Sequence, residues 1–339
     1  MRAVVFVGPG SWSVVEVPDP VAVSGHVLLR PIATGVCGTD LHLLAGKFMA
    51  RYPLIPGHEI VGEVVSVGDG VTTLVPGDFV AADNTVLCGH CEFCRRDQPL
   101  FCTNFYSLGV NGPGGFAELV AVASEKCFLL MGLDPMVAVM TEPLACAIHG
   151  ADRLALRPGS DVLVFGAGPT GLMLSQLLLH GGAARITVAA PTDQKLALAR
   201  SFGVDETVRL DRTDLASAVP LLRKIAPRGF DAVIEATGSV DVLALTPELT
   251  LAGGTILVYG MADDTARVPF SPYDIFSREL TIKGSFAQTH CFDRALMALR
   301  SGRVRTEGIV TDHVPLERFG DALAAVASSA SVKAAVTLN

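Results

Sequence analysis

Charged side chains are scarce in this sequence. Of its 339 residues, 18% are charged and 50% are hydrophobic, and aromatic residues make up only 6%, with one tryptophan. A chain that stays unfolded shows the opposite balance, with few apolar residues and much charge. The composition therefore excludes a disordered or fibrous protein. It predicts a large, well-packed globular protein whose length suffices for about two domains.

Basic clusters and long apolar runs are also lacking. The chain has 26 Lys and Arg against 34 Asp and Glu, a formal net charge of −8, whereas binding to nucleic-acid phosphates needs clustered cations. No apolar run approaches the roughly 18 residues that a membrane-spanning helix needs. The N-terminus, MRAVVFVGPGSW, lacks the features of a signal peptide. We therefore expect a cytoplasmic protein with neither a nucleic-acid nor a membrane partner.

Disulfides are not expected in that compartment, because cytosolic thiols stay reduced. Half of the eight cysteines nevertheless fall in one stretch, CGHCEFCRRDQPLFC, at Cys88, Cys91, Cys94 and Cys102. An iron–sulfur run of the bacterial ferredoxin type ends with a shorter gap and a proline, and a redox site of the thioredoxin kind needs a single Cys-x-x-Cys. Four thiolates suit a closed tetrahedral zinc site that has no position left for a substrate. The spacing predicts a structural zinc.

The chain changes its pattern twice. Up to about residue 120, short β-rich runs such as HVLLRPIA and GDFVAAD are separated by Gly-Asp and Pro-Gly turns. From about residue 158, apolar strands (160–168, 184–190, 230–238, 253–261) alternate with helical segments (170–182, 193–203). From about residue 285 the pattern is mixed again. Alternating strands and helices predict an α/β, doubly wound parallel sheet beside a mainly β region.

A glycine-rich turn opens the second region. Gly166, Gly168 and Gly171 follow an apolar strand and begin a helix, with Pro169 and Thr170 between them. In this context the first glycine allows a tight turn, the second lets a pyrophosphate approach the backbone, and the third allows close packing. The helix N-terminus supplies free N–H groups to the phosphates. The motif predicts a dinucleotide site, and the alternative is a glycine-rich turn without a ligand.

The next strand bears on which dinucleotide binds. In NAD sites this strand ends in an acidic residue that contacts the ribose, but here the corresponding residue is Ala190. Without that carboxylate a 2′-phosphate is not repelled, and Lys195, together with Arg200 or Arg209, could pair with it. The pattern weakly favours NADP over NAD as the cofactor. An NAD site that uses backbone and Thr192 hydroxyl contacts stays open.

Potential metal ligands are spread over the first 142 residues. The stretch GVCGTDLH supplies Cys37, GHE supplies His58 and Glu59, and TEPLA supplies Glu142. Taken singly, each has a structural explanation, for example a small buried thiol or a core histidine. Together they offer one thiolate, one imidazole and two carboxylates. Three protein ligands and an open fourth position are typical of a catalytic zinc.

At this point the sequence resembles the zinc-containing medium-chain alcohol dehydrogenases. GHEIVGEVVSVGDGV (57–71) is similar to the zinc signature of that family, and CGTD, PGD, GGFAELV, GAGPTG and EATGS follow in the family's order. The resemblance covers essentially the whole chain. It implies a GroES-like catalytic domain made of residues 1–150 and 285–339, and a Rossmann NAD(P)-binding domain of residues 151–284 inserted between them.

The resemblance also implies roles for individual residues. Cys37 and His58 would bind a catalytic zinc, with Glu59 or Glu142 as the third protein ligand. Together with the structural zinc at the four clustered cysteines, this gives two zinc ions per chain. The zinc would polarise the substrate oxygen, and Thr39 would pass a proton through the cofactor ribose to His42. Hydride transfer belongs to the cofactor. The family further implies a homo-oligomer, a dimer or a tetramer.

The glutamate at position 142 narrows the substrate class. Simple alcohol dehydrogenases carry a cysteine there, whereas the run EPLACAIHGADRL resembles the sorbitol, polyol-phosphate and threonine dehydrogenase branch. Sorbitol dehydrogenases carry an Arg-Tyr pair where this chain continues GSFAQTHCF, so we expect a polyhydroxylated alcohol rather than sorbitol itself. Gln288 and His290 of this segment either contact substrate hydroxyls or cap the next helix.

Other functions are compatible with parts of this sequence. A threonine dehydrogenase or a simple alcohol or aldehyde reductase would use the same scaffold. A non-catalytic NADPH-binding protein is disfavoured because every zinc ligand and relay residue is present. A zinc-knuckle nucleic-acid binder is opposed by the negative charge and by the dinucleotide motif. The cysteines outside both metal sites, Cys127, Cys146 and Cys291, are expected to be structural thiols.

Overall fold

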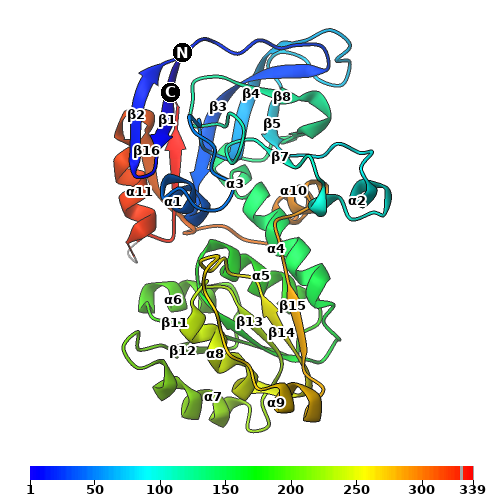
Figure 1. The fold of residues 1–339 in the computed structure, drawn as a ribbon, viewed down its shortest axis with the longest axis vertical. Coiled ribbons are helices and arrows are strands. Elements are labelled where there is room, and N and C mark those ends of the chain that lie inside the picture. Colours follow the sequence, from blue (N-terminus) through cyan, green and yellow to red (C-terminus); the bar gives the residue numbers. More distant parts are fainter. Residues whose placement is uncertain (329–330, 339) are drawn as a thin grey trace. The chain divides into compact units, whose positions relative to one another are not determined.

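Two compact units make up the chain in the computed structural model, which describes residues 1–328 and 331–338. Unit 1 comprises Met1–Ala145, Gln288–Ser301 and Thr306–Asn339, and unit 2 comprises Cys146–Ala287 and Gly302–Arg305. Unit 1 is thus built from both ends of the chain, and unit 2 is inserted between them (Figure 1). The predicted range 285–339 includes positions 329, 330 and 339, which lie outside the described residues.

Unit 2 is built on a parallel sheet. Within the described residues its six strands lie in the order β12-β11-β10-β13-β14-β15, and every pair is parallel. Counted from β10, this order is the one of the Rossmann fold, with its switch point between β10 and β13. The strands are β10 (Asp161–Phe165), β11 (Arg185–Ala190), β12 (Glu206–Arg209), β13 (Phe230–Glu235), β14 (Thr250–Val258) and β15 (Thr281–Gly284).

Helices connect these strands and cover the sheet (Figure 1). They are α5 (Pro169–His180), α6 (Asp193–Ser201), η3 (Leu215–Ala218), α7 (Val219–Ile225), α8 (Val240–Leu249) and α9 (Pro272–Ser277), and α4 (Thr141–Leu154) crosses the boundary between the two units. Val162, Leu163 and Val164 of β10 have no exposed surface, as expected for a strand covered on both faces. The predicted parallel, doubly wound sheet is confirmed.

Unit 1 is mainly β. Its seven-stranded sheet, within the described residues, has the order β16-β17-β3-β4-β5-β9, with β8 beside β3, and β1 and β2 form a hairpin. The strands are β1 (Arg2–Gly8), β2 (Ser11–Glu16), β3 (His26–Val36), β4 (Glu59–Val67), β5 (Phe79–Ala82), β6 (Thr85–Val86), β7 (Tyr106–Ser107), β8 (Val120–Ala123), β9 (Cys127–Leu129), β16 (Val310–Pro315) and β17 (Lys333–Thr337).

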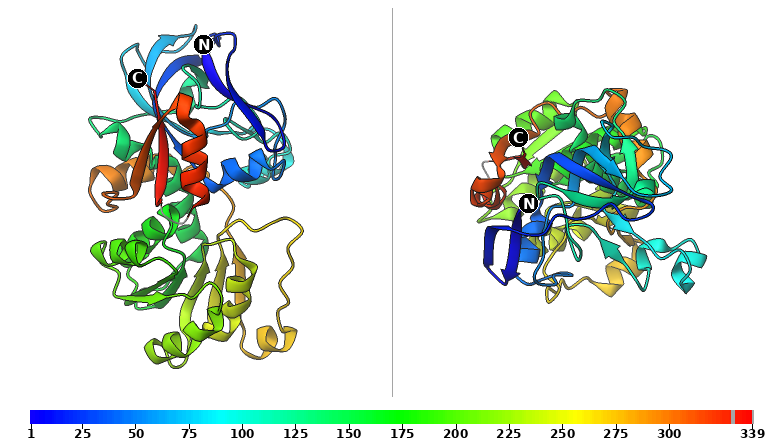
Figure 2. Two further views of the ribbon diagram at one scale, coloured as in Figure 1. Left: turned by 90° about the vertical axis from the view of Figure 1, so that its left-hand side faces the viewer. Right: turned by 90° about the horizontal axis from the view of Figure 1, so that it is seen from above.

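Short helices complete unit 1, and one of them closes its core. The helices are α1 (Gly38–Leu44), α2 (Glu92–Arg95), η1 (Pro99–Phe101), η2 (Ser124–Lys126), α3 (Pro135–Ala138), α10 (Phe292–Arg300), η4 (Leu316–Arg318) and α11 (Phe319–Ala327). Helix α11 lies beside β17 (Figure 2). The ring of Phe319 lies 4.9 Å from that of Phe116, 5.2 Å from that of Trp12 and 6.1 Å from that of Phe6, measured between centroids. Aromatic packing thus joins the N-terminal hairpin to the C-terminal helix.

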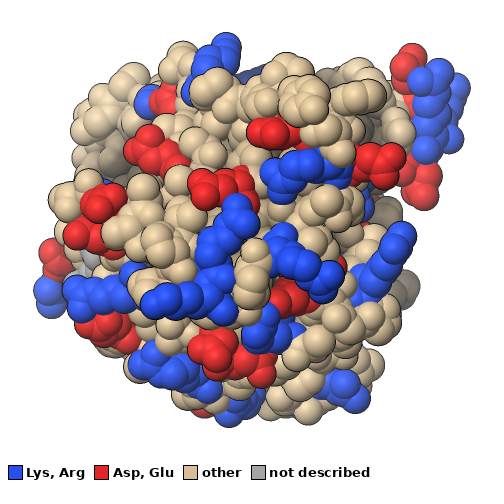
Figure 3. Space-filling model, turned by 90° about the horizontal axis from the view of Figure 1, so that it is seen from below, with Lys and Arg blue, Asp and Glu red and all other residues tan. Residues whose placement is uncertain are grey.

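Surface charge concerns a possible nucleic-acid partner, and helix length concerns a possible membrane partner. On the face shown in Figure 3, Lys and Arg side chains are interspersed with Asp and Glu rather than gathered into one basic patch. Among the described residues, none of the helices combines the length and the apolar character needed to span a bilayer.

Candidate metal and cofactor sites

Cys37, His58 and Glu59 come together at one end of the unit 1 sheet. Strands β3 and β4 are antiparallel, and Gly35 pairs with Glu59. Cys37 directly follows β3, and His58 directly precedes β4. The antiparallel pairing of the two strands therefore brings Cys37 close to His58 and Glu59. The ligand atoms of the three residues all lie within 4.8 Å of one another. Antiparallel pairing therefore makes neighbours of residues that the sequence separates.

Asp40 orients two of these residues. The backbone N–H of Cys37 donates to Asp40 Oδ2 at 2.8 Å, and Asp40 Oδ1 lies 3.7 Å from His58 Nδ1. Burial has the largest single effect and lowers the pKa of His58, but the charge and hydrogen bonding of Asp40 and Cys37 together outweigh it and hold that pKa well above its ordinary value. The Asp40 carboxylate thus lies beside the His58 imidazole. Such outer partners set the tautomer and the orientation of histidine ligands.

Lys333 is a member of the site that the sequence analysis missed. It begins β17, which pairs with β3 so that Ala334 lies opposite Val36, and this register places Lys333 beside Cys37. Lys333 Nζ lies 2.5 Å from both oxygens of Glu59 and donates its hydrogen bond to Oε1. Burial has the largest single effect and lowers the pKa of Lys333, but the charge and hydrogen bond of Glu59 together with the charges of Cys37 and Glu142 outweigh it and raise that pKa. The one signal in the sequence was a lysine before the apolar run AAVTL.

Gly35 leaves room for this ion pair. A Cβ at position 35 would lie 1.8 Å from Glu59 Oε2 and 3.1 Å from Lys333 Cε. Any side chain there would displace the carboxylate or part the strands, since heavy atoms do not approach so closely. The glycine is therefore required by the buried ion pair.

Glu142 and Thr39 lie near this group, and His42, the other predicted relay residue, lies on the same helix as Thr39. Glu142 stands in the first turn of α4, and its charge contributes to raising the pKa of Lys333, but it is not one of the three residues whose ligand atoms converge. Thr39 Oγ1 lies 3.6 Å from Cys37 Sγ. His42 follows Thr39 by three residues on α1, so both side chains lie on one face of that helix.

The group fits a metal ion. Thiolate, imidazole and carboxylate are the ligands that zinc takes in catalytic sites. Glu59 is 1% exposed, and both of its oxygens lie 2.5 Å from Lys333 Nζ, so its charge is already paired within the chain. A metal ion is instead supported by the donor types and by the convergence of the three ligand atoms within 4.8 Å of one another.

The four clustered cysteines also converge. The sulfurs of Cys88, Cys91, Cys94 and Cys102 lie within 4.8 Å of one another. Backbone N–H groups donate to two of them, from Cys88 to Cys102 Sγ at 3.4 Å and from Cys91 to Cys88 Sγ at 3.3 Å. The backbone N–H of Cys94 lowers the pKa of Cys91 to about 5, whereas burial and the neighbouring Cys91 raise the pKa of Cys94 to about 12. Four adjacent sulfurs cannot all ionise unless a cation holds them together.

The glycine-rich turn lies at the switch point of the unit 2 sheet. Gly166 directly follows β10 with a φ of +109°, and Gly168 is the N-cap of α5, with Pro169 in its first turn. A Cβ on Gly171 would lie 2.3 Å from the Gly166 carbonyl oxygen. The tight turn and the free N–H groups of α5, Thr170 included, fit a pyrophosphate.

Glu235, the first residue of the EATGS motif, holds the neighbouring turn. This carboxylate ends β13 and is 1% exposed. Its Oε1 accepts hydrogen bonds from the N–H groups of Thr237 at 2.6 Å and Gly238 at 2.9 Å. Burial raises the pKa of Glu235. A Cβ on Gly166 would lie 2.9 Å from the Ala236 carbonyl oxygen, so the two turns touch.

The end of β11 carries no carboxylate. The strand ends at Ala190, which is 2% exposed. Lys195 of α6 is half-buried, and both burial and the charge of Arg212 lower its pKa, so two cations lie near each other. The other predicted cations have partners, because Arg209 forms an ion pair with Asp193 and Arg200 donates to Thr207.

Gln288 and His290 are placed differently from one another. Gln288 is 1% exposed, and its Nε2 donates to Asp83 Oδ1 at 2.8 Å. His290 is exposed, with a φ of 54°. The N-cap of α10 is Cys291, whose side chain makes no capping hydrogen bond. Neither Gln288 nor His290 therefore occupies the N-cap position.

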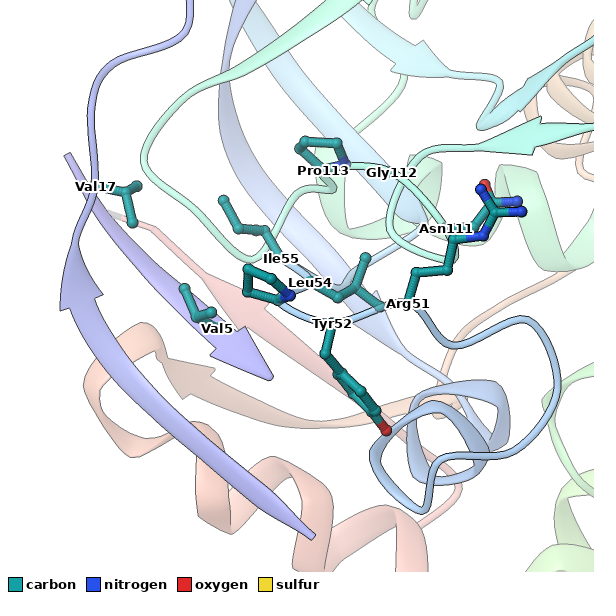
Figure 4. Close-up of a pocket in the computed structure, with 10 residues that line it drawn as sticks. Val5, Val17, Arg51, Tyr52, Leu54, Ile55, Asn111, Gly112 and Pro113 are labelled. Carbon is teal, nitrogen blue, oxygen red and sulfur yellow. The ribbon is translucent and has the colours of Figure 1, made fainter. Parts of the chain in front are cut away.

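A separate pocket of about 310 Å³ opens in unit 1 (Figure 4). Its walls come from β1, the 51–55 segment and the 111–113 segment. The Tyr52 hydroxyl donates to the Leu43 carbonyl at 2.5 Å. Among the described residues that line the pocket there is no predicted metal ligand or relay residue.

Two family models match most of the chain. Residues 23–132 match the alcohol dehydrogenase GroES-like domain, and residues 169–301 match the zinc-binding dehydrogenase domain. The chain belongs to the zinc-binding alcohol dehydrogenase family. The predicted membership and the predicted fold class are thus confirmed, including the GroES-like character of unit 1.

Individual relatives in this family are polyol and threonine dehydrogenases. D-arabinitol dehydrogenase 1 of Uromyces fabae is 43% identical over 100% of this chain and 97% of its own length. D-altritol 5-dehydrogenase of Agrobacterium fabrum is 33% identical over 94% of each chain. L-threonine 3-dehydrogenase of Saccharopolyspora erythraea is 34% identical over 85% of this chain and 84% of its own length.

A solved structure has the same fold throughout. A protein described as a zinc-binding dehydrogenase from Sinorhizobium meliloti 1021, bound to NADP, superposes with a TM-score of 0.93 at 31% identity. The match covers 99% of each chain.

We expect Gly35→Ala to lower the free energy of unfolding by about 1–3 kcal/mol, because its Cβ would overlap the carboxylate of Glu59. Chemical denaturation followed by circular dichroism measures this loss. Gly8→Ala is the matched control, since a Cβ on Gly8 would meet nothing within 4 Å. A Gly35→Ala protein as stable as Gly8→Ala would contradict the steric role of Gly35.

Proposed function

We propose that this chain is a zinc-dependent oxidoreductase that transfers a hydride between NAD(P) and a secondary alcohol or ketone, with polyols as its substrates. The observation that carries the proposal is the convergence of Cys37, His58 and Glu59 in unit 1. Their donor set suits a catalytic zinc with one open position. The similarity to D-arabinitol and D-altritol dehydrogenases supports the substrate class.

The proposed zinc ligands are Cys37, His58 and Glu59. Glu59 is chosen over Glu142 because its oxygens lie with the other two donors. When bound, the zinc supplies a Lewis acid for the substrate oxygen. Glu142 stays close enough to influence Lys333 and adds negative charge beside the site.

The residues around the ligands hold the site and move a proton. Asp40 fixes His58, and Lys333 holds Glu59 against β17. Oxidation of an alcohol releases a hydride, which the nicotinamide accepts, and a proton. Side chains of the protein must carry this proton to the solvent. The Thr39 hydroxyl accepts this proton while it passes its own proton on, and His42, on the same face of α1, delivers a proton to water.

Unit 2 is the proposed cofactor domain. Gly166, Gly168 and Gly171 would receive the pyrophosphate, and the α5 N-terminus would bind its charge. We propose NADP as the preferred cofactor, because Ala190 offers no carboxylate and because Lys195 and Arg212 place two cations near each other in α6 and the loop after β12. The NADP-bound structural relative supports this preference.

The four-cysteine group is the proposed structural zinc site. Its ligands fill all four tetrahedral positions, so it would stabilise the 88–102 segment without contacting substrate. We also propose that the protein is a homo-oligomer, a dimer or a tetramer, in the cytoplasm. The family resemblance supports the oligomer, and the composition supports the cytoplasmic location.

A threonine dehydrogenase is the second candidate. The relative from Saccharopolyspora erythraea supports it at 34% identity. Both activities oxidise a secondary alcohol, so the same metal and relay residues would serve either of them. The substrates differ in charge, because threonine carries an ammonium and a carboxylate group.

The proposal is tested by a panel of D-arabinitol, D-altritol, sorbitol and L-threonine with NAD⁺ and NADP⁺, with zinc measured on the same sample. We expect polyol oxidation, no more than weak threonine oxidation, and about two zinc ions per chain. A metal-loaded protein that oxidises none of these alcohols would sink the proposed function, and one that prefers threonine would favour the second candidate.

Glu59→Gln is expected to remove one of the two zinc ions, because a neutral amide is a much weaker zinc ligand than a carboxylate. Glu142→Gln is the matched control and is expected to keep both. Zinc per chain after dialysis against a weak chelator measures the difference. Because Glu59→Gln also leaves Lys333 without its partner, the double variant Glu59→Gln, Lys333→Met is measured beside it. Equal zinc loss in the two glutamine variants would refute Glu59 as the third ligand.

Lys195→Ala is expected to raise the dissociation constant of NADP⁺ about tenfold or more and to leave that of NAD⁺ nearly unchanged, since a cation–phosphate contact is lost. Fluorescence titration with each dinucleotide measures both constants. Arg209→Ala is the matched control, because Arg209 is paired with Asp193. Equal weakening of both dinucleotides by Lys195→Ala would speak against a 2′-phosphate contact.

A further inference from the structure

The Glu59 carboxylate has two competing partners. Lys333 Nζ lies 2.5 Å from each of its oxygens. The same carboxylate supplies one of the three donor atoms that converge within 4.8 Å, where a metal ion fits. A carboxylate that already faces an ammonium group attracts a second cation less strongly, and the bound ammonium repels that cation. The strength of Glu59 as a metal ligand therefore depends on Lys333.

The charge of Lys333 also faces other acidic groups of the site. Burial has the largest effect on the pKa of Lys333 and lowers it, whereas the charges of Glu59, Cys37 and Glu142 raise it. Lys333 is 4% exposed, so water screens these charges little. The ammonium group thus already supplies, within the chain, positive charge to the acidic groups that would face a metal.

The backbone keeps Lys333 in this place. It begins β17, where Lys333 pairs with Val310 of β16 and the next residue, Ala334, pairs with Val36 of β3. The Lys333 carbonyl accepts from Thr311 Oγ1 at 3.3 Å. A Cβ on Gly35 would lie 3.1 Å from Lys333 Cε, so the lysine side chain packs directly over β3. A lysine held by two neighbouring strands keeps its charge near the site when a metal binds.

We propose that Lys333 is an internal counter-ion that competes with zinc for Glu59 and lowers the zinc affinity of the Cys37 site. The inference rests on the proposed function, in which Glu59 is a zinc ligand. In the metal-free chain Lys333 offsets a carboxylate charge that would otherwise be buried unpaired. In the metal-bound chain the same ammonium opposes the zinc. Lys333 is thus a positioning residue, and Glu59 is the most weakly held of the three ligands.

The proposal predicts an effect on zinc opposite to that of a purely structural ion pair. If the pair only held β17 on β3, removal of its charge would loosen the site and weaken zinc binding. If Lys333 competes with zinc, removal of its charge destabilises the metal-free form more than the zinc-bound form. Zinc, which binds the folded chain, then binds more tightly and stabilises the chain more.

The test measures the zinc affinity of Lys333→Gln, which keeps a hydrogen-bond donor for Glu59 and removes the charge. Competition with a chelator of known affinity gives the zinc dissociation constants, and Cys37→Ser identifies the constant that belongs to this site. We expect Lys333→Gln to lower that constant about tenfold or more. The rise in melting temperature on adding zinc is expected to be larger than in the wild type. Lys333→Arg restores the charge and is expected to restore the wild-type constant.

Lys126→Gln is the matched control. Lys126 Nζ lies 2.9 Å from Asp83 Oδ2 in the same unit, and Asp83 is largely buried. Asp83 is not one of the three converging donors. This variant is therefore expected to lower the melting temperature and to leave the zinc constant of the Cys37 site as in the wild type.

The outcomes separate the inference from the proposed function. Unchanged or weaker zinc binding in a folded Lys333→Gln protein would overturn the inference, as would equal tightening in Lys126→Gln. If Lys333→Gln folds only with zinc, the rate at which a chelator removes this zinc from the loaded protein decides. Slower release than in the wild type supports the inference, and faster release overturns it. A wild-type protein that oxidises none of the alcohols would instead contradict the proposed function.

Discussion

The ion pair between Glu59 and Lys333 constrains the whole catalytic end of unit 1. Both side chains are buried, at 1% and 4% exposure, and two charges withdrawn from water must remain in contact to offset their desolvation. This contact requires β3 between β4 and β17, and it requires a glycine at position 35. The same strand order sets Cys37 beside His58. The metal group is thus a consequence of one buried electrostatic pairing and the sheet that makes it possible.

The pairing also explains why unit 1 needs both ends of the chain. Lys333 lies 274 residues from Glu59, and the aromatic cluster around Phe319 joins the C-terminal helix to the N-terminal hairpin. Unit 2 can be inserted between them because its parallel sheet is complete by itself. A C-terminal truncation would therefore remove Lys333, beside the proposed metal site, as well as part of the core.

The two cysteine-containing sites differ in the physics of their ligands. At positions 88–102 the four sulfurs lie within 4.8 Å of one another, where a backbone hydrogen bond lowers the pKa of Cys91 and burial raises the pKa of Cys94. At Cys37 a single thiol shares the site with an imidazole and a carboxylate whose own charges are already balanced by Asp40 and Lys333. The first arrangement suits a structural ion. The second, with three ligands, leaves a coordination position for chemistry.

The features that depend on neighbouring residues could be predicted from the sequence alone. The glycine turn after β10, the cysteine spacing, the alternation of strands and helices and the family all follow from contiguous patterns, because turns, helix starts and local metal loops are short-range structures. Lys333 beside Glu59 and Asp40 beside His58 could not be predicted in this way. Sheet register decides those contacts, and register depends on which distant strands pair, so only the tertiary structure could bring these side chains together.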